Sequence, residues 1–82
     1  MRKLPIAEVE WIDSSASGSW RKRQEYEKEQ PSECRTAGYL LKANRHCVVI
    51  VQSIDPEGDN VSDSMTIPRS CVKSVTRLEK KP

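Results

Sequence analysis

The chain has 82 residues, which is enough for one small domain with a thin hydrophobic core. Hydrophobic residues make up 35% of it and charged residues 32%, with 14 basic residues against 12 acidic ones. A net charge of +2 is too small to indicate nucleic-acid binding by bulk electrostatics, and no apolar run is long enough for a membrane-spanning helix. We therefore expect a single domain over residues 1–82 with no membrane partner.

The N-terminal segment is basic, but no apolar stretch follows it, so we expect no signal peptide and a cytoplasmic protein. An odd number of cysteines at wide spacing, Cys34, Cys47 and Cys71, is typical of a reduced compartment, where cysteine acts as a small buried hydrophobe. With one histidine and no CxxC pair, we expect no metal and no cofactor. His46 and Cys47 are neighbours on a predicted strand and point to opposite faces, so they cannot form a nucleophile pair.

Alternating apolar and polar residues in "PIAEVEWID" predict a first strand over residues 5–13. A segment rich in serine follows and predicts a loop. Residues 20–30 contain good helix formers, but their only large apolar side chains are Trp20 and Tyr26, and their charges oppose the helix dipole. We therefore expect a mobile insertion over residues 14–31 that holds a short helix or an irregular loop.

The next two predicted strands are residues 32–43 and 46–54. Gly38 lies inside the earlier one, where a glycine predicts a sharp bend or a bulge. The run "HCVVIVQSI" is the most β-prone in the chain and should be the central strand. The breakers in "DPEGDN" predict a loop before a fourth strand over residues 61–68.

Pro68 ends the fourth strand because proline has no N–H to donate to a sheet. "RSC" then predicts a 3₁₀ turn, followed by a fifth strand over residues 71–78 and a solvated tail over residues 79–82. This turn, the bent second strand and the early insertion together predict a small five-stranded SH3-like barrel, whose closure removes free edges. The spacing of Val72 and Val75 leaves open which of them faces the core. The predicted core consists of Val9, Trp11, Leu40, Val49, Val51, Ile67, Val72 and Val75.

The second half of the chain resembles the Sm-like branch of these barrels. "GYLLKANRHCVVIV" is similar to the bent-strand segment of that family, and "TIPRSCVKSV" to its last two strands. The resemblance implies a small barrel and an RNA-binding ring. However, Asn44 and Val48 stand where the family has an acidic residue and a polar residue that holds a base. Val48 cannot hydrogen-bond a base, so the RNA pocket of the family is not expected here.

The whole chain also resembles short accessory proteins of phages and prophages. These often read "VEWIDS…W…GYLL…IP…V…L", a pattern that this chain shows from its first strand to its last. The resemblance implies a viral accessory gene.

The segment "WRKRQEY" is the first candidate binding site, because basic residues lie between two aromatic ones. Stacking and cationic contacts of this kind hold nucleotides and single strands, and Trp20, Arg21, Arg23 and Tyr26 would supply them. The acidic residues that follow favour a protein partner over a long polyanion. The alternative is that Trp20 covers the end of the barrel while the basic residues are simply solvated.

Arg69, Lys73 and Arg77 form the second candidate site. Lys73 and Arg77 share a strand face with Val75 between them, and Val75 faces outward if Val72 faces the core. An outward apolar residue flanked by cations is typical of an interface.

No nucleophile, acid–base pair or metal-ligand pattern supports catalysis, so we do not expect an enzyme. The leading hypothesis is a phage-type binding protein that modulates a host or defence factor. It would occlude a host protein or sequester a small anionic ligand such as a nucleotide, and self-association into a homo-oligomer would suit so small a core. The alternative is an Sm-like RNA-binding ring, which would make nucleic acid the partner.

Overall fold

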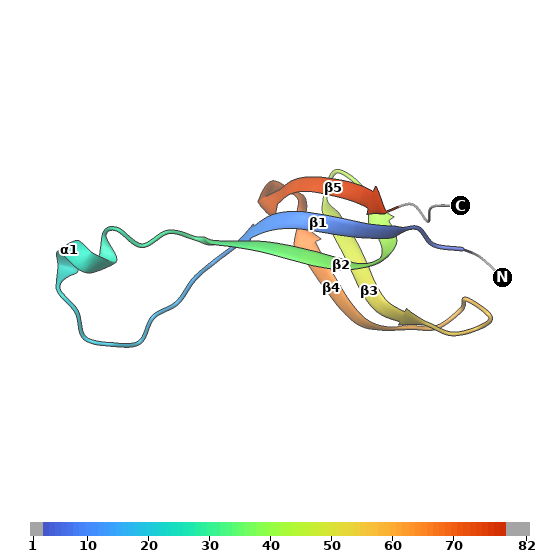
Figure 1. Cartoon of the computed structure of the whole chain (residues 1–82), viewed down its shortest axis with the longest axis horizontal. Helices are drawn as coiled ribbons and strands as arrows, with labels where there is room; N and C mark the ends of the chain where they lie inside the picture. The colour runs from blue at the N-terminus through green and yellow to red at the C-terminus, as the bar shows by residue number, and fades with distance from the viewer. Residues whose placement is uncertain (1–2, 79–82) are drawn as a thin grey trace.

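The computed structural model describes residues 3–78, so the predicted tail over residues 79–82 lies outside the described part. Five antiparallel strands form one sheet in the order β4-β3-β2-β1-β5 (Figure 1). The elements are β1 (Ile6–Asp13), α1 (Arg23–Tyr26), β2 (Ser32–Ala43), β3 (Cys47–Ile54), β4 (Val61–Pro68), the 3₁₀ turn η1 (Arg69–Cys71) and β5 (Val72–Leu78). The predicted small, mainly β fold with a short helix after the first strand is confirmed. In the described part, β4 and β5 do not pair, so the sheet is not closed and the predicted removal of free edges does not occur.

Residues 14–31 form an arm that extends away from the sheet and carries α1 near its far end (Figure 1). The ladder between β1 and β2 continues to the pair Asp13 and Ser32, where the arm begins. With the arm included, the molecule measures 55 × 26 × 23 Å. The sheet and the arm therefore present separate surfaces. The mobility expected of the arm stays a prediction.

The core is a cluster of six buried side chains, Ala7, Val9, Leu40, Val48, Ile50 and Ile67. The prediction of Val49 as a core residue is wrong, because this side chain is half-buried and the buried positions of β3 on this face are Val48 and Ile50. An apolar run without alternation does not show which face is inward. Val51 is fully buried as predicted. Because it directly follows Ile50 in β3, its side chain lies on the opposite face of the sheet, and it pairs with Tyr39 of β2.

The cysteines are less buried than predicted. All three are half-buried and unpaired, and Cys71 packs against the core cluster. Cys47 begins β3 opposite Pro68, at the end of the ladder between β3 and β4, where the sheet covers it incompletely.

A bulge in β5 resolves the positions of Val72 and Val75. Val75 pairs with Val9 and Val72 pairs with Trp11, so Lys73 is inserted as an extra residue and both valines lie on the core face. Both pack against the core cluster, as does the partly buried Trp11. The interpretation of Val75 as an outward residue between two cations is therefore wrong, because it assumed an unbroken alternation.

Gly38 allows β2 to pack tightly against β3. It pairs with Ala7 across the sheet, so two small residues lie side by side on the core face. A Cβ atom at Gly38 would be 2.6 Å from Cγ2 of Ile50 and 2.7 Å from the carbonyl oxygen of Val51. Ile50 therefore occupies the space that a larger residue would need.

We expect Gly38→Ala to lower the free energy of unfolding by about 1–3 kcal/mol, because the added methyl group overpacks the core and meets a backbone oxygen. Gly18→Ala is the matched control, because a Cβ atom there has no heavy atom within 4 Å. Urea unfolding of both variants measures the difference. Equal stability of the two variants would contradict the tight contact.

Asp55 organises the loop between β3 and β4. Its Oδ1 accepts hydrogen bonds from the N–H groups of Gly58 at 2.7 Å, Asp59 at 2.9 Å and Asn60 at 3.2 Å, and its Oδ2 accepts one from Nδ2 of Asn60 at 2.8 Å. These donors lower the pKa of the Asp55 carboxyl, with the side chain of Asn60 as the largest cause. Gly58 has a φ of 82°, which suits glycine at this turn.

We expect Asp55→Asn to be less stable than the parent at neutral pH, with the difference shrinking on acidification. A carboxyl whose pKa is lower in the folded state stabilises the fold when ionised, and this contribution is lost as the pH falls through the acid range, below about pH 4. Urea unfolding at a series of pH values measures the gap. A gap that stays constant between neutral and acid pH would rule out a charge-dependent role.

Candidate functional site: the arm and the groove at its base

The side chain of Arg21 connects several parts of the arm. Its Nη2 donates a hydrogen bond to Oγ of Ser17 at 2.9 Å and forms an ion pair with Glu29. Its guanidinium also lies over the ring of Tyr26, 4.3 Å from the centroid. Arg21 therefore links the start of the arm, the helix and the returning segment.

Tyr26 is the half-buried residue of this network. Its hydroxyl donates a hydrogen bond to the carbonyl oxygen of Ser19. The neighbouring Arg21 is the largest cause of a lowered pKa at the Tyr26 phenol, while Glu29 is the largest cause of a raised pKa at Arg21. Both residues are on the surface, where such contacts contribute little to global stability. We infer that they shape the arm and leave the stability of the sheet largely unchanged.

Trp20 has no such role, because its side chain is completely exposed, at 102% of the reference area. The alternative in which Trp20 covers the end of the barrel is therefore wrong. The arm extends away from the sheet and carries Trp20 with it (Figure 1). An exposed indole next to the contacts of Arg21 leaves a large apolar group available for a partner.

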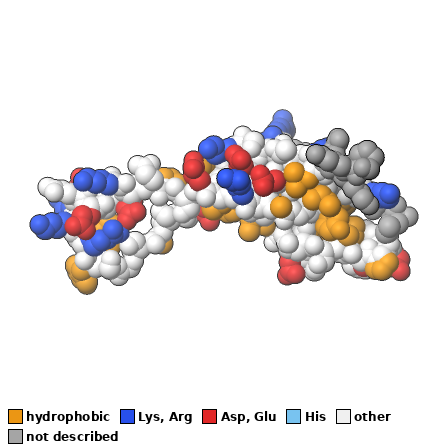
Figure 2. All heavy atoms as spheres, in the orientation of Figure 1, with side chains coloured by type: hydrophobic (Ala, Val, Ile, Leu, Met, Phe, Trp, Pro, Cys, Tyr) orange, Lys and Arg blue, Asp and Glu red, His pale blue; other side chains and the backbone are white. Residues whose placement is uncertain are grey.

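Arg23 begins α1 and, with Arg21, Tyr26 and Glu27, lines an open hollow of about 390 Å³. Among the described residues it has no ion pair. Figure 2 shows basic and acidic side chains intermixed on the arm. Of the four residues predicted on this segment, two are thus engaged within the arm, and Trp20 and Arg23 face solvent.

The second predicted set, Arg69, Lys73 and Arg77, does not form one surface. Lys73 is the bulged residue, and its Nζ bonds Oε1 of Glu33 at 3.2 Å. Arg77 pairs with Ala7 near the end of β5, on the same sheet face as the core residues, while Arg69 lies in η1. The bulge breaks the strand face that Lys73 and Arg77 were predicted to share.

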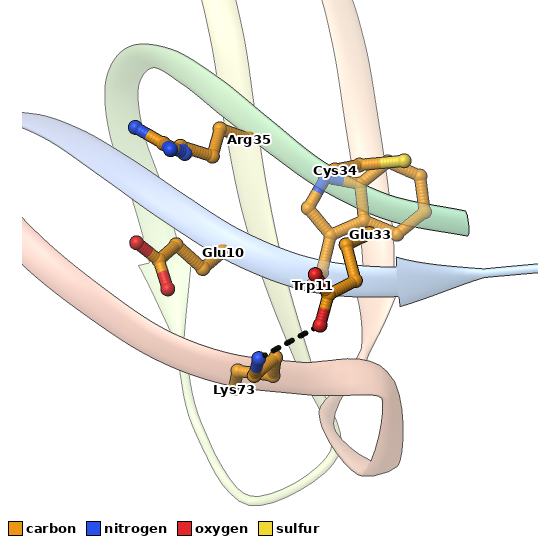
Figure 3. Close-up of a pocket in the computed structure, with 6 residues that line it drawn as sticks. All are labelled: Glu10, Trp11, Glu33, Cys34, Arg35 and Lys73. Atoms are coloured by element: carbon orange, nitrogen blue, oxygen red, sulfur yellow. Dashed lines mark hydrogen bonds and ion pairs between the residues drawn. The ribbon is translucent and has the colours of Figure 1, made fainter. Parts of the chain in front are cut away.

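A charged groove of about 220 Å³ lies on the sheet at the base of the arm. Figure 3 shows the side chains of Glu33 and Lys73 pointing toward one another across it. Glu10 and Arg35 are direct cross-strand partners in the ladder between β1 and β2. The lining residues are Glu10, Trp11, Glu33, Cys34, Arg35 and Lys73.

The charges of this groove compensate one another, with two acids and two bases among the lining residues. Nε1 of Trp11 also donates a hydrogen bond to Oγ1 of Thr36 at 3.0 Å, which joins β1 to β2. We infer that the groove supports the base of the arm. The sequence analysis did not identify this groove because its lining residues come from three different strands. The alternating charges within these strands were the signal that could have located it.

Residues 3–78 contain no group of three or more His, Cys, Asp or Glu side chains arranged to hold a metal ion. Within the same range, no helix has the length and apolar character needed to cross a membrane. No protein-family model, curated protein or solved structure matches the chain.

We expect Arg21→Ala to disorder the arm without destabilising the sheet. The substitution removes the contacts to Ser17, Tyr26 and Glu29, all of which lie within the arm, so the free energy of unfolding should stay close to that of the parent. Amide order parameters measured by NMR should fall in residues 14–31 alone. Arg23→Ala is the control and should leave them unchanged. Unaltered order parameters in Arg21→Ala would contradict the role of this network.

Proposed function

We propose that the protein is a non-enzymatic binding protein that engages another protein through the arm, with Trp20 as the anchor. The observation that carries the proposal is the complete exposure of Trp20 on an element that stands away from the sheet. Trp is among the residues most often found at the energetic centre of an interface, where truncation commonly removes about 2 kcal/mol or more. Isolated apolar residues are common on surfaces, but a fully exposed indole on a projecting arm is the strongest candidate in the described chain.

The contacts of Arg21 support this proposal by restricting the arm before binding. An ordered binding element loses less conformational entropy on association than a free loop does. In this arrangement Arg21 and Tyr26 hold the shape of the arm, while Trp20 enters an apolar pocket of the partner and Arg23 pairs with an acidic group at its rim. The intermixed charges of the arm fit a protein surface of mixed charge better than a long polyanion.

The resemblance to phage accessory proteins extends the proposal to a host or defence factor as the partner. The mechanism would be stoichiometric occlusion of a surface that the factor needs. Three unpaired cysteines support a cytosolic location in the host cell as part of the proposal.

A second candidate function, an Sm-like RNA-binding ring, is favoured by the free edges of the sheet. Within the described part, β4 and β5 are edge strands without a partner, and edges of this kind can pair with another copy of the chain. Such a ring should elute as an oligomer and co-purify with nucleic acid, with affinity that falls steeply as salt increases. The occluding protein should purify free of nucleic acid.

The test of the leading proposal is the affinity of Trp20→Ala for a partner isolated from host lysate with the parent protein. We expect a loss of about 30-fold or more, which corresponds to about 2 kcal/mol. Val61→Ala is the matched control, because Val61 is an exposed apolar residue at the start of β4 on the sheet. If Trp20→Ala folds and binds as the parent does, the arm is not the binding element.

A further inference from the structure

A basic hollow lies on the sheet between the turn that joins β2 to β3 and the 3₁₀ turn η1. It is open, has a volume of about 460 Å³, and is lined by Ala43, Asn44, Arg45 and Arg69. Two of these four residues carry a guanidinium group and none carries a carboxylate. This composition contrasts with the compensated groove at the base of the arm.

Hydrogen bonds fix the backbone at both arginines. Oδ1 of Asn44 accepts from the N–H groups of His46 at 2.8 Å and Cys47 at 3.0 Å, which closes the turn. The N–H of Asn44 donates to the carbonyl oxygen of Cys47 at 3.0 Å. The N–H of Arg69 donates to the carbonyl oxygen of His46 at 3.0 Å, which joins η1 to the turn. The two arginines are therefore held at the same end of the sheet by a hydrogen-bonded frame.

Neither guanidinium is neutralised within the described residues. Nε of Arg45 donates a hydrogen bond to Nε2 of His46 at 3.2 Å, and neither Arg45 nor Arg69 has an ion pair there. Arg21 and Lys73, by comparison, each pair with a glutamate. Two uncompensated cations on a fixed frame produce a local positive potential, which attracts an anion.

We propose that this hollow binds the phosphoryl group of a small molecule such as a mononucleotide. The planar guanidinium group matches phosphate oxygens with paired hydrogen bonds, and two such groups from different turns can hold one phosphoryl group from two sides. The hollow has no aromatic lining residue on which a base could stack, so the phosphoryl group is the part recognised. The frame is preformed, so binding requires no rearrangement of the backbone. This site is separate from the arm and independent of the function proposed for it.

The test is an NMR titration of the whole chain with adenosine 5′-monophosphate, with adenosine and inorganic phosphate as comparison probes. We expect the nucleotide and phosphate to shift the amide signals of residues 43–47 and 68–71, and adenosine to leave them unchanged. Arg45→Gln and Arg69→Gln should each weaken nucleotide binding about tenfold or more, because each substitution removes charge-assisted hydrogen bonds to the phosphoryl oxygens. Arg69→Lys keeps the positive charge but lacks the planar guanidinium group, so its affinity for the nucleotide should lie between those of the parent and Arg69→Gln.

Lys28→Gln is the control, because it removes an exposed cation from the arm and should leave nucleotide binding unchanged. Loss of binding in Lys28→Gln together with unchanged binding in Arg45→Gln would overturn the proposal. So would equal shifts with adenosine. An oligoribonucleotide without a terminal phosphate that binds the same residues more tightly than the mononucleotide would also overturn it, and would assign the hollow to nucleic acid. A failure here would leave the Trp20 result unaffected, because Arg45 and Arg69 lie on the sheet and Trp20 lies on the arm.

Discussion

The fold depends on the close contact of β2 with β3 at Gly38. Gly38 and Ala7 lie opposite one another, and the absence of large side chains there lets Ile50 approach the backbone of β2. The buried cluster that includes Ile50 also draws on β1, β2 and β4, so this contact joins the middle strands into one core. In a chain of 82 residues with a thin core, few other contacts can substitute for it.

The same arrangement places the buried core and the proposed binding element in different parts of the chain. The sheet holds the buried apolar residues, whereas the arm is maintained by polar contacts within residues 14–31, chiefly those of Arg21. The paired charges of the groove at the base of the arm lie on the strands that lead into it. Surface contacts of this kind determine the conformation of the arm but contribute little to the stability of the whole fold. The arm can therefore change in sequence or conformation without loss of the fold.

The sequence predicted the strands well because breakers and alternation delimit them. Gly38 and Pro68 acted as expected, and the bounds of β1, β3 and β5 differ from the prediction by one residue at their starts. The core face of β3 was not predictable in full, because "CVVIV" has no polar residue to reveal the phase. The inward positions of both Val72 and Val75 depend on a bulge at Lys73, and no local sequence pattern indicates this bulge.

The candidate sites were only partly predictable, because they also depend on contacts between residues that are separated along the chain. The pattern of aromatic and basic residues located the arm segment, but it did not distinguish the exposed Trp20 from the engaged Arg21 and Tyr26. That distinction requires the position of Glu29, eight residues further along the chain from Arg21. The hollow of Arg45 and Arg69 joins turns 24 positions apart, and the pairing of β3 with β4 brings them together.

The proposed function requires that the arm presents Trp20 to a partner while the sheet stays unchanged. Fluorescence of Trp20 in a Trp11→Phe background tests this directly, because Trp20 is then the remaining tryptophan of the chain. We expect emission typical of a solvent-exposed indole in the free protein, with a shift to shorter wavelength and protection from a soluble quencher when the isolated partner is added. Binding of the partner with no change in Trp20 emission or quenching would contradict it.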